Sequence, residues 1–289
     1  MSNNLEINSQ NRPITIFGAG TLGRRIALMF STRGGEVRIY DKNSDALAAA
    51  KSFVEESLPE VVKTVPNGKA ATLKTFTDFD QAIDRAWLVV ESLPEIPDLK
   101  IEVLGQLDRA VADDTIIATN SSSYRSSELA AKVEHKNRLL NMHFMMPPMA
   151  RAVELMTCGE TDRAIIDFLS HKLADYGLSP YVAEKESMGF IYNRIWAAIK
   201  RESLYVVAQG VASPQTVDRI FVETLGTKQG PFRSMDMVGL DVVLDIEEHY
   251  AKERRGIPEE PRELLRKMIA EGKLGVKSGE GFYNDYKKQ

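Results

Sequence analysis

A glycine-rich segment follows a short apolar run near the start of the chain. The run Ile14-Thr15-Ile16-Phe17 is β-branched and aromatic, which predicts a buried strand over 14–17. The segment Gly18-Ala19-Gly20-Thr21-Leu22-Gly23 comes next and matches the pattern G-x-G-x-x-G, and apolar residues then recur at helical spacing over 21–32. A strand, a glycine turn and a helix in this order predict the first βαβ unit of a dinucleotide-binding sheet.

This segment predicts a site for NAD. Glycine at the first position allows the tight turn, at the second it lets backbone approach a pyrophosphate, and at the third it lets helix and strand pack closely. The phosphates would then lie at the helix N-terminus, where free N–H groups favour an anion. The next predicted strand, 37–40, ends at Asp41, whose carboxylate suits a ribose 2′-hydroxyl and repels the 2′-phosphate of NADP. The alternative is a plain glycine turn without a ligand. We expect cofactor contacts from Gly18, Gly20, Thr21, Leu22, Gly23 and Asp41.

The rest of the chain predicts two domains. Strand-like runs alternate with helical patterns, which indicates a Rossmann-type α/β domain with a mostly parallel sheet. Beyond Lys185 only helices are predicted, so an all-α domain follows. The expected boundaries are 1–186 and 187–289. The expected strands are 14–17, 37–40, 87–90, 115–118, 139–143, 153–156 and 180–183, and the main expected helices are 21–32, 46–58 ended by Pro59, 98–110, 162–176, 191–209, 214–225, 235–253 and 261–270.

Charge and cysteine content narrow the class of protein. With 37 basic and 41 acidic residues the net charge is −4, which weighs against a nucleic-acid binder. No apolar run approaches the ~18 residues of a membrane span, and the polar first 13 residues do not resemble a signal peptide. Cys158 is the one cysteine, which excludes an intramolecular disulfide and a multi-cysteine metal site. We therefore expect a soluble cytoplasmic protein with no metal, membrane or nucleic-acid partner.

Four polar residues are candidates for chemistry. His143 ends a predicted strand, and the carboxyl ends of strands face the ligand crevice of an open α/β sheet. Glu154 lies within an apolar strand, where a carboxylate must be paired or face a site. Ser122 follows the strand ending at Ala118, and Asn193 lies in the first turns of the first helix of the second domain. The alternatives are a core histidine, an edge-strand glutamate, a helix-capping serine and an ordinary polar residue of a helix.

These motifs together resemble the L-3-hydroxyacyl-CoA dehydrogenase family. The resemblance implies that His143 is the general base, that Glu154 orients it, and that Ser122 and Asn193 hydrogen-bond the substrate oxygen. We also expect cofactor contacts from Glu95, Lys100 and Asn120. The resemblance also implies a homodimer that forms through the helical domain. The motifs that carry it are Gly18–Gly23, Asp41, Thr119–Ser123, His143-Phe144, Val153-Glu154, Gly189-Phe190 with Asn193-Arg194, Gly230-Pro231-Phe232 and 273–283.

Departures from the family pattern leave the substrate open. Met145-Met146-Pro147-Pro148 stands where the family usually has Asn-Pro, and the segment between Tyr40 and Trp87 is short beside that of the family's thioester enzymes. The preferred interpretation is an NAD-dependent dehydrogenase of L-3-hydroxyacyl-CoA thioesters in fatty acid metabolism. The alternatives are a dehydrogenase of a free 3-hydroxy acid, similar to the L-gulonate 3-dehydrogenase and λ-crystallin branch, and a non-catalytic NAD-binding relative.

Overall fold

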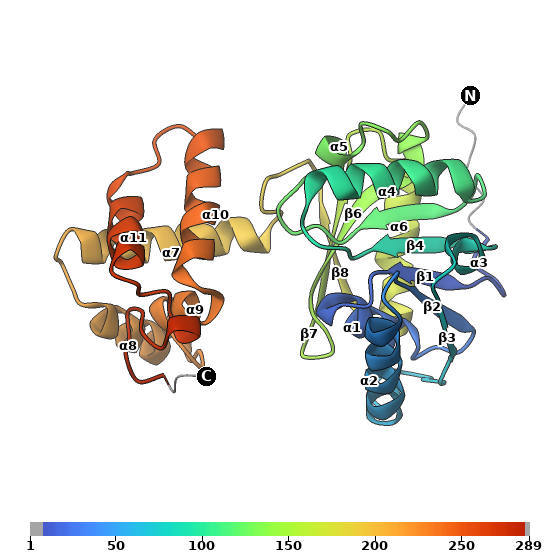
Figure 1. Cartoon of the computed structure of the whole chain (residues 1–289), viewed down its shortest axis with the longest axis horizontal. Helices are drawn as coiled ribbons and strands as arrows, with labels where there is room; N and C mark the ends of the chain where they lie inside the picture. Colours follow the sequence, from blue (N-terminus) through green and yellow to red (C-terminus); the bar gives the residue numbers. More distant parts are fainter. Residues whose placement is uncertain (1–7, 287–289) are drawn as a thin grey trace. The chain divides into compact units, whose positions relative to one another are not determined.

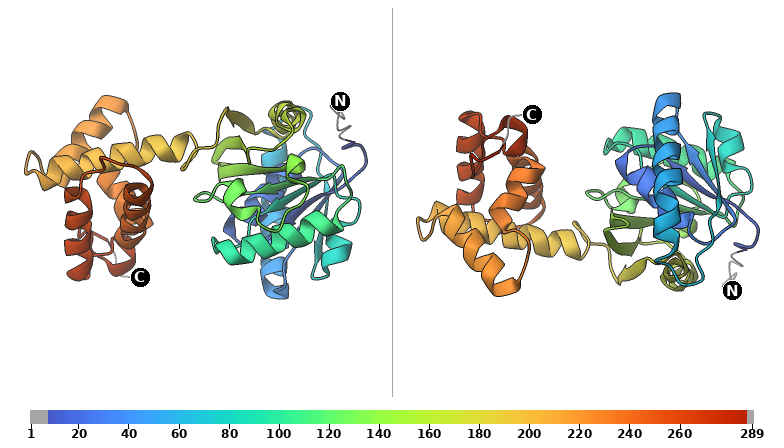
Figure 2. Two further views of the ribbon diagram at one scale, coloured as in Figure 1. Left: turned by 90° about the horizontal axis from the view of Figure 1, so that it is seen from above. Right: turned by 90° about the horizontal axis from the view of Figure 1, so that it is seen from below.

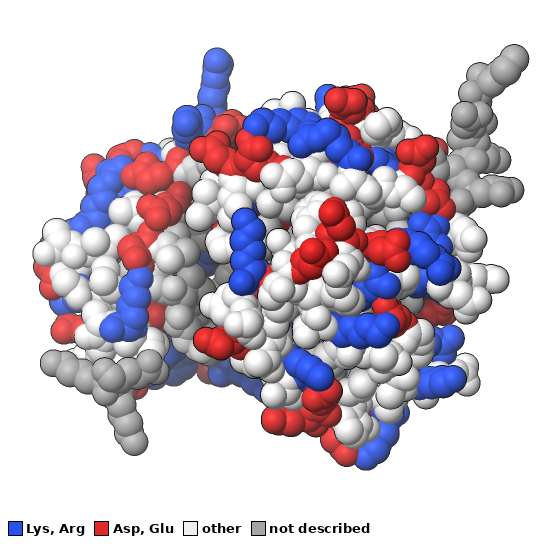
Figure 3. All heavy atoms as spheres, turned by 45° about the vertical axis from the view of Figure 1, so that its right-hand side comes forward, with Lys and Arg blue, Asp and Glu red and all other residues white. Residues whose placement is uncertain are grey.

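The chain forms two compact units that divide between Ile191 and Tyr192 (Figure 1). The computed structural model describes residues 8–286, and the first unit runs a few residues beyond the expected boundary at 186. Within residues 8–286, no helix combines the length and the apolar character needed to cross a membrane. On the face drawn in Figure 3, acidic and basic side chains are interspersed, as a nearly balanced charge implies.

The first unit, here called the sheet unit, is built on eight strands in the order β3-β2-β1-β4-β5-β6-β7-β8. Neighbouring strands from β3 to β6 pair parallel, β6 and β7 pair antiparallel, and β7 and β8 pair parallel. A doubly wound parallel sheet with this order is a Rossmann-type fold. The strands are β1 (Ile14–Phe17), β2 (Glu36–Tyr40), β3 (Thr72–Phe76), β4 (Leu88–Glu91), β5 (Ile116–Thr119), β6 (Leu139–Met146), β7 (Ala150–Thr157) and β8 (Ser179–Ala183).

Helices cover both faces of the central strands (Figures 1 and 2). Ile14 and Ile16 of β1 join the core that α1, α2 and α6 close, whereas Phe17 joins the core on the other face with α3 and α4. Successive side chains of a strand point to opposite faces, so a strand buried on both faces is apolar throughout. The helices of this unit are α1 (Thr21–Phe30), α2 (Ser44–Val62), α3 (Phe79–Ile83), α4 (Pro97–Ala110), α5 (Ser126–Leu129) and α6 (Arg163–Lys172), with 3₁₀ turns at Lys136–Arg138 and Leu173–Tyr176.

The second unit, here called the helical unit, packs five α-helices around an apolar core. Leu204 of α7, Phe232 of α9 and Leu265 of α11 are fully buried in this core. The C-terminal segment is tied down by Asp236, whose carboxylate accepts hydrogen bonds from the backbone N–H groups of Phe282 and Tyr283, both at 3.0 Å. The helices are α7 (Tyr192–Ala208), α8 (Pro214–Leu225), α9 (Pro231–Val238), α10 (Leu240–Glu253) and α11 (Glu260–Ala270), with a 3₁₀ turn at Val276–Ser278.

Two expected helix boundaries are wrong. The helix expected to end at Pro59 continues to Val62, because Leu58 and Val61 on either side of the proline are both buried in the core. The single helix expected over 235–253 is two helices, since Gly239 adopts a φ of 105° that interrupts the α-helical backbone. Strand β3 was not among the expected strands, and its side chains are partly exposed at the edge of the sheet.

Candidate active site

The glycines of the turn after β1 have two different roles, one in packing and one in leaving room for a ligand. Gly18 has a φ of 109°, and a Cβ there would collide with the carbonyl of Ser92. A Cβ at Gly23 would overlap the carbonyl oxygen of Gly18. A Cβ at Gly20, by contrast, would meet no atom within 4 Å. Packing therefore requires Gly18 and Gly23, whereas the open space beside Gly20 fits the approach of a ligand to the backbone.

The N-terminus of α1 and the end of β2 meet at this turn. Gly20 is the N-cap residue of α1 and has no side chain that could accept from the first-turn N–H groups. These groups therefore stay available for an anion. Asp41 accepts a 2.8 Å hydrogen bond from the N–H of Ala19 and a 2.9 Å bond from the N–H of Asn43. Its carboxylate is thus fixed beside the turn with lone pairs to spare. The arrangement fits the pyrophosphate and adenosine ribose of NAD.

Lys100 lies in a buried ionic network at the carboxyl end of β4. Its Nζ donates to Glu91 Oε1 at 2.7 Å and to the Leu93 carbonyl at 3.1 Å, and it lies 3.2 Å from Glu95 Oε2. Glu91 also accepts hydrogen bonds from Thr119 Oγ1 at 2.6 Å and from the N–H of Leu93. All three donors of the lysine have acceptors, so Lys100 fixes the loop after β4 and has no donor left for a ligand.

Glu95 and Asn120 fix the serine loop after β5. Glu95 Oε1 accepts hydrogen bonds from Ser121 Oγ at 2.6 Å and from the N–H groups of Ser122 and Ser123, both at 3.0 Å. Asn120 Oδ1 accepts from the N–H of Phe144 at 2.9 Å, which joins this loop to β6. The backbone of Ser122 is therefore held while its side chain lines the adjoining cleft.

His143 and Glu154 face each other across the antiparallel pair of β6 and β7. They are partners in the strand register, and His143 Nδ1 lies 2.8 Å from Glu154 Oε2. The other carboxylate oxygen accepts a 2.9 Å hydrogen bond from the N–H of Ile191. The ring of Phe190 stacks on the imidazole at a centroid distance of 4.8 Å. Both members of the pair are at least 95% buried, so the pair is held rigidly and away from bulk water.

Six of the predicted residues of the sheet unit line one cleft of about 470 Å³, whereas Gly18, Gly20, Thr21, Gly23, Asp41 and Glu154 are not among its lining residues. Its walls come from the loops after β4 and β5 and from the end of β6, which is the carboxyl edge of the sheet. Met145 and Met146 are among the lining residues, but Met149 is 76% exposed and is not. The lining residues are Leu22, Ser92, Leu93, Glu95, Lys100, Asn120, Ser122, His143, Phe144, Met145, Met146 and Ala150.

The structure adds two residues to the predicted site and places one in the other unit. Glu91 was missed, although it ends an apolar run as Glu154 does, and the same argument about a carboxylate among apolar residues would have found it. The stacking of Phe190 on His143 has no such signal in the sequence. Asn193 lies in the first turn of α7, in the helical unit, whereas Ser122, His143 and Glu154 lie in the sheet unit.

Comparison with known families accounts for this arrangement. Residues 13–187 match the NAD-binding domain of 3-hydroxyacyl-CoA dehydrogenase, and residues 189–285 match the C-terminal domain of the same family. The chain belongs to the 3-hydroxyacyl-CoA dehydrogenase family. It is an NAD-dependent dehydrogenase with a Rossmann-like domain and a helical C-terminal domain.

Individual relatives agree with this assignment. The mitochondrial hydroxyacyl-coenzyme A dehydrogenase of Homo sapiens is 32% identical over 93% of this chain and 90% of its own. The 3-hydroxyacyl-CoA dehydrogenase-like protein LAM1 of Cochliobolus heterostrophus is 51% identical over 153 residues, which are 51% of this chain and only 32% of that protein. The structure of (S)-3-hydroxybutyryl-CoA dehydrogenase PaaH1 from Ralstonia eutropha superposes with a TM-score of 0.84 at 30% identity, covering 96% of this chain and 99% of that one.

Proposed function

We propose that the protein interconverts an L-3-hydroxyacyl-CoA and a 3-oxoacyl-CoA, with His143 as the general base. The observation that carries this proposal is the buried 2.8 Å contact of His143 with Glu154 at a cleft beside the glycine turn. A histidine suits reversible proton transfer near neutral pH because its ordinary pKa lies there.

Glu154 sets the protonation of the imidazole. An ionised carboxylate only accepts hydrogen bonds, so His143 donates its Nδ1–H to Glu154 and keeps the lone pair on Nε2. Nε2 takes the proton of the substrate hydroxyl while the hydrogen on the same carbon leaves as hydride, and the C–O bond becomes a carbonyl. NAD held at the glycine turn would supply the hydride acceptor. Glu154 then stabilises the imidazolium, and in the reverse direction the imidazolium returns the proton.

Ser122 and Asn193 are proposed to hydrogen-bond the substrate oxygen. The Ser122 backbone is anchored to Glu95 while its side chain lines the cleft, so its hydroxyl needs little further ordering. Donors held in place at a developing charge contribute more than mobile ones. The amide of Asn193 is proposed to be the second donor to this oxygen.

The cofactor is proposed to occupy the carboxyl edge of β1 and β2. Gly18, Gly20, Thr21, Leu22 and Gly23 present the first turn of α1 to the pyrophosphate, and Asp41 accepts from the adenosine ribose. Glu95 and Asn120 contribute from the rim of the cleft. Lys100 acts through Glu95, because its own donors are already used.

The charge of the cleft favours a thioester over a free acid. Lys100 is the cation among the described residues that line the cleft, and two carboxylates already neutralise it. A free 3-oxo acid carries a carboxylate only two bonds from the reacting carbon, and its burial without a cationic partner is costly. A thioester carbonyl carries no charge at this place.

A comparison of matched substrates tests the proposal. NADH oxidation is measured with acetoacetyl-CoA and with acetoacetate, which share the 3-oxobutanoyl group but carry CoA or a free carboxylate at its end. We expect kcat/KM to be at least about 100-fold higher for acetoacetyl-CoA, which corresponds to roughly 3 kcal/mol of transition-state stabilisation. Equal or higher kcat/KM with acetoacetate would overturn the substrate class and favour the free-acid alternative.

We further propose that the helical unit forms a homodimer. Large apolar side chains remain exposed on its helices, including Ile195 of α7 at 56%, Ile220 of α8 at 64% and Met237 of α9 at 63%. Clustered apolar exposure on helices marks surfaces that bury against a partner. Because α8 and α9 pack against each other, Ile220 and Met237 belong to neighbouring helices.

A further inference from the structure

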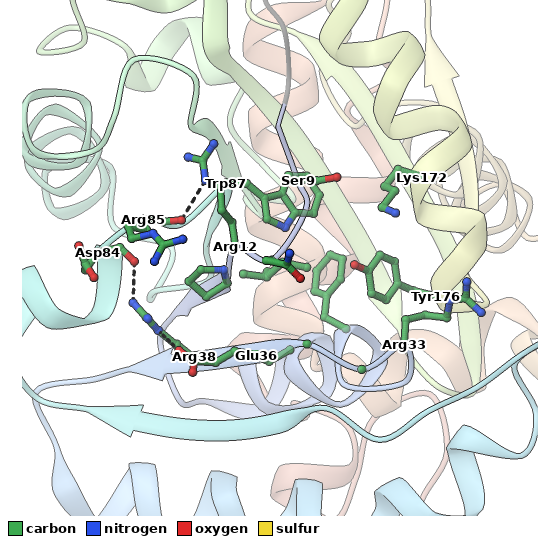
Figure 4. Close-up of a pocket in the computed structure, with 17 residues that line it drawn as sticks. Ser9, Arg12, Arg33, Glu36, Arg38, Asp84, Arg85, Trp87, Lys172 and Tyr176 are labelled. Carbon is green, nitrogen blue, oxygen red and sulfur yellow. Dashed lines mark hydrogen bonds and ion pairs between the residues drawn. The ribbon is translucent and has the colours of Figure 1, made fainter.

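A second cavity lies at the opposite edge of the sheet from the proposed active site. It has a volume of about 500 Å³ and is formed where β1, β2 and β4 begin (Figure 4). Ile14 of β1 and Val37 of β2 line the cavity, as does Trp87, which immediately precedes β4. Its lining residues are Ser9, Asn11, Arg12, Pro13, Ile14, Phe30, Arg33, Gly34, Gly35, Glu36, Val37, Arg38, Asp84, Arg85, Trp87, Lys172 and Tyr176.

The lining of this cavity is cationic. Five of its residues are Arg or Lys and two are acidic. The carboxylate of Glu36 is neutralised by Arg38 within the cavity and by Lys74 outside it, and Arg12 pairs with Asp114. Arg85 forms no ion pair with any residue in the described part of the chain. The remaining excess of positive charge favours an anion.

A further pair of cations lies on the other side of the cavity. Lys172 reaches Asp175 at 3.1 Å but remains partly exposed, and Arg33 uses one guanidinium nitrogen for the carbonyls of Pro66 and Asn67. The other guanidinium nitrogens of Arg33 make no hydrogen bond to residues 8–286. This side therefore offers donors that do not depend on breaking an existing network.

Three aromatic residues border the cavity, of which Phe30 is fully covered and Tyr176 is 8% exposed. Phe30 and Tyr176 are in edge-to-face contact at 5.0 Å, and Trp87 is 2% exposed. The Tyr176 hydroxyl and the Trp87 indole N–H make no hydrogen bond to the described residues, and neither atom is fully buried, so both are accessible from the cavity. Figure 4 shows the Tyr176 hydroxyl and the Lys172 amino group on the same side of the cavity. Burial raises the pKa of Tyr176 to about 12, so the hydroxyl is a donor at neutral pH.

We propose that this cavity binds a small organic anion with an aromatic body. The carboxylate or phosphate lies by Lys172, Tyr176 and Arg33, and the body lies along the accessible parts of Trp87 and Tyr176. A cavity of about 500 Å³ is within the usual range for small-molecule sites, roughly 300–1,000 Å³. Nucleoside monophosphates and aromatic carboxylates share this chemistry. The proposal does not rest on the reaction at the carboxyl edge.

Tryptophan fluorescence reports on this cavity directly. The chain has two tryptophans, and Trp196→Phe leaves Trp87 as the single reporter. Full-length protein is titrated with AMP, benzoate, inorganic phosphate and adenosine. We expect a saturable change with AMP or benzoate, a weaker response to phosphate and none to adenosine, which lacks the charge. Absence of a saturable change with both AMP and benzoate overturns the proposal.

A second variant distinguishes binding in this cavity from binding at the proposed cofactor site, which would also accept adenine nucleotides. Gly20→Asp places a carboxylate where the pyrophosphate is expected and has room for its side chain. The fluorescence response is expected to persist in the Trp196→Phe/Gly20→Asp protein. Its loss there would assign the response to the cofactor site and overturn the second site.

Two substitutions then test the proposed contacts. Tyr176→Phe keeps the ring but removes the hydroxyl, and Lys172→Glu reverses the charge. Each is expected to raise the dissociation constant by about tenfold or more, because hydrogen bonds to charged groups are among the stronger ones. Lys252→Glu, at an exposed position of α10, is the control and should change nothing. Unchanged binding in both cavity variants contradicts the assignment.

Discussion

Lys100 and Glu91 form an ion pair with 2.7 Å between Nζ and Oε1, and the two side chains are 1% and 0% exposed. The pair links β4 to α4 and, through Glu95, reaches the serine loop after β5. A buried charge that loses its partner destabilises a protein far more than the intact pair stabilises it. The conformation of the loops at the rim of the cleft therefore depends on both residues.

Removing one partner should cost more than removing both. Glu91→Gln leaves Lys100 with Glu95 as its one carboxylate, and we expect the free energy of unfolding to fall by about 3–5 kcal/mol. In Glu91→Gln/Lys100→Met no lone buried charge remains, so part of that loss should be recovered. Urea denaturation measures both variants, with the exposed Glu102→Gln as control. A double variant less stable than Glu91→Gln would contradict this account.

Substitutions at two glycines of the turn should have different effects, one on stability and the other on cofactor binding. Gly23→Ala forces a Cβ into the Gly18 carbonyl, so we expect about 3 kcal/mol of destabilisation. Gly20→Ala places its methyl in open space and should leave the melting temperature nearly unchanged while weakening NAD by about tenfold or more. Thermal denaturation and NADH titration measure the two effects. A strongly destabilised Gly20→Ala protein would show that this position also serves packing.

Periodicity predicted most of the sheet because strands buried on both faces are apolar throughout. Strand β3 escaped prediction because its edge position leaves it partly polar, and Pro59 was misleading because buried residues on both sides hold the helix together. His143 and Glu154 were predictable from a histidine at a strand end and a carboxylate in an apolar strand. The stacking of Phe190 on His143 was not, since it depends on a backbone turn at Gly189 and Phe190, both with positive φ, far from His143 in the sequence.

Substitutions in the histidine pair should lower turnover without weakening the cofactor. We expect His143→Asn to reduce kcat by about 10²–10⁴-fold through loss of the base. Glu154→Gln keeps the size of the side chain but loses the charge that supports the imidazolium, so kcat should fall by about 10–100-fold. Affinity for NADH should stay within about twofold in both, as measured by fluorescence titration. Turnover of His143→Asn equal to that of the parent would exclude His143 as the base.

Asp108 should contribute stability that depends on pH. Burial alone would raise the pKa of Asp108, but the N–H groups of His135 and Glu134 and the guanidinium of Arg138 donate to it and bring that pKa below its usual 3.8. The folded state thus favours the carboxylate. Its contribution is complete above the unfolded pKa near 3.8 and is lost as pH falls through the folded value.

The pH dependence distinguishes this charge effect from packing. We expect Asp108→Asn to cost about 3 kcal/mol at pH 7, because Arg138 is left buried without its carboxylate. The difference from the parent should shrink as the pH falls below about 4. Urea denaturation at pH 7, 4 and 3 gives the comparison. A difference that stays constant over this range would assign the effect to packing alone.

Charges on the exposed apolar helices should dissociate the proposed homodimer. Ile220 and Met237 are more than 60% exposed on neighbouring helices, so glutamates there cost the monomer little, but an interface would have to bury two unpaired charges. Light scattering of the parent is expected to give about twice 32.3 kDa, and Ile220→Glu/Met237→Glu should give the monomer mass. Met149→Glu is a matched control, since this methionine is also more than 60% exposed but lies in the sheet unit. A parent that is monomeric at micromolar concentration contradicts the proposal, and a double variant that stays dimeric moves the interface away from α8 and α9.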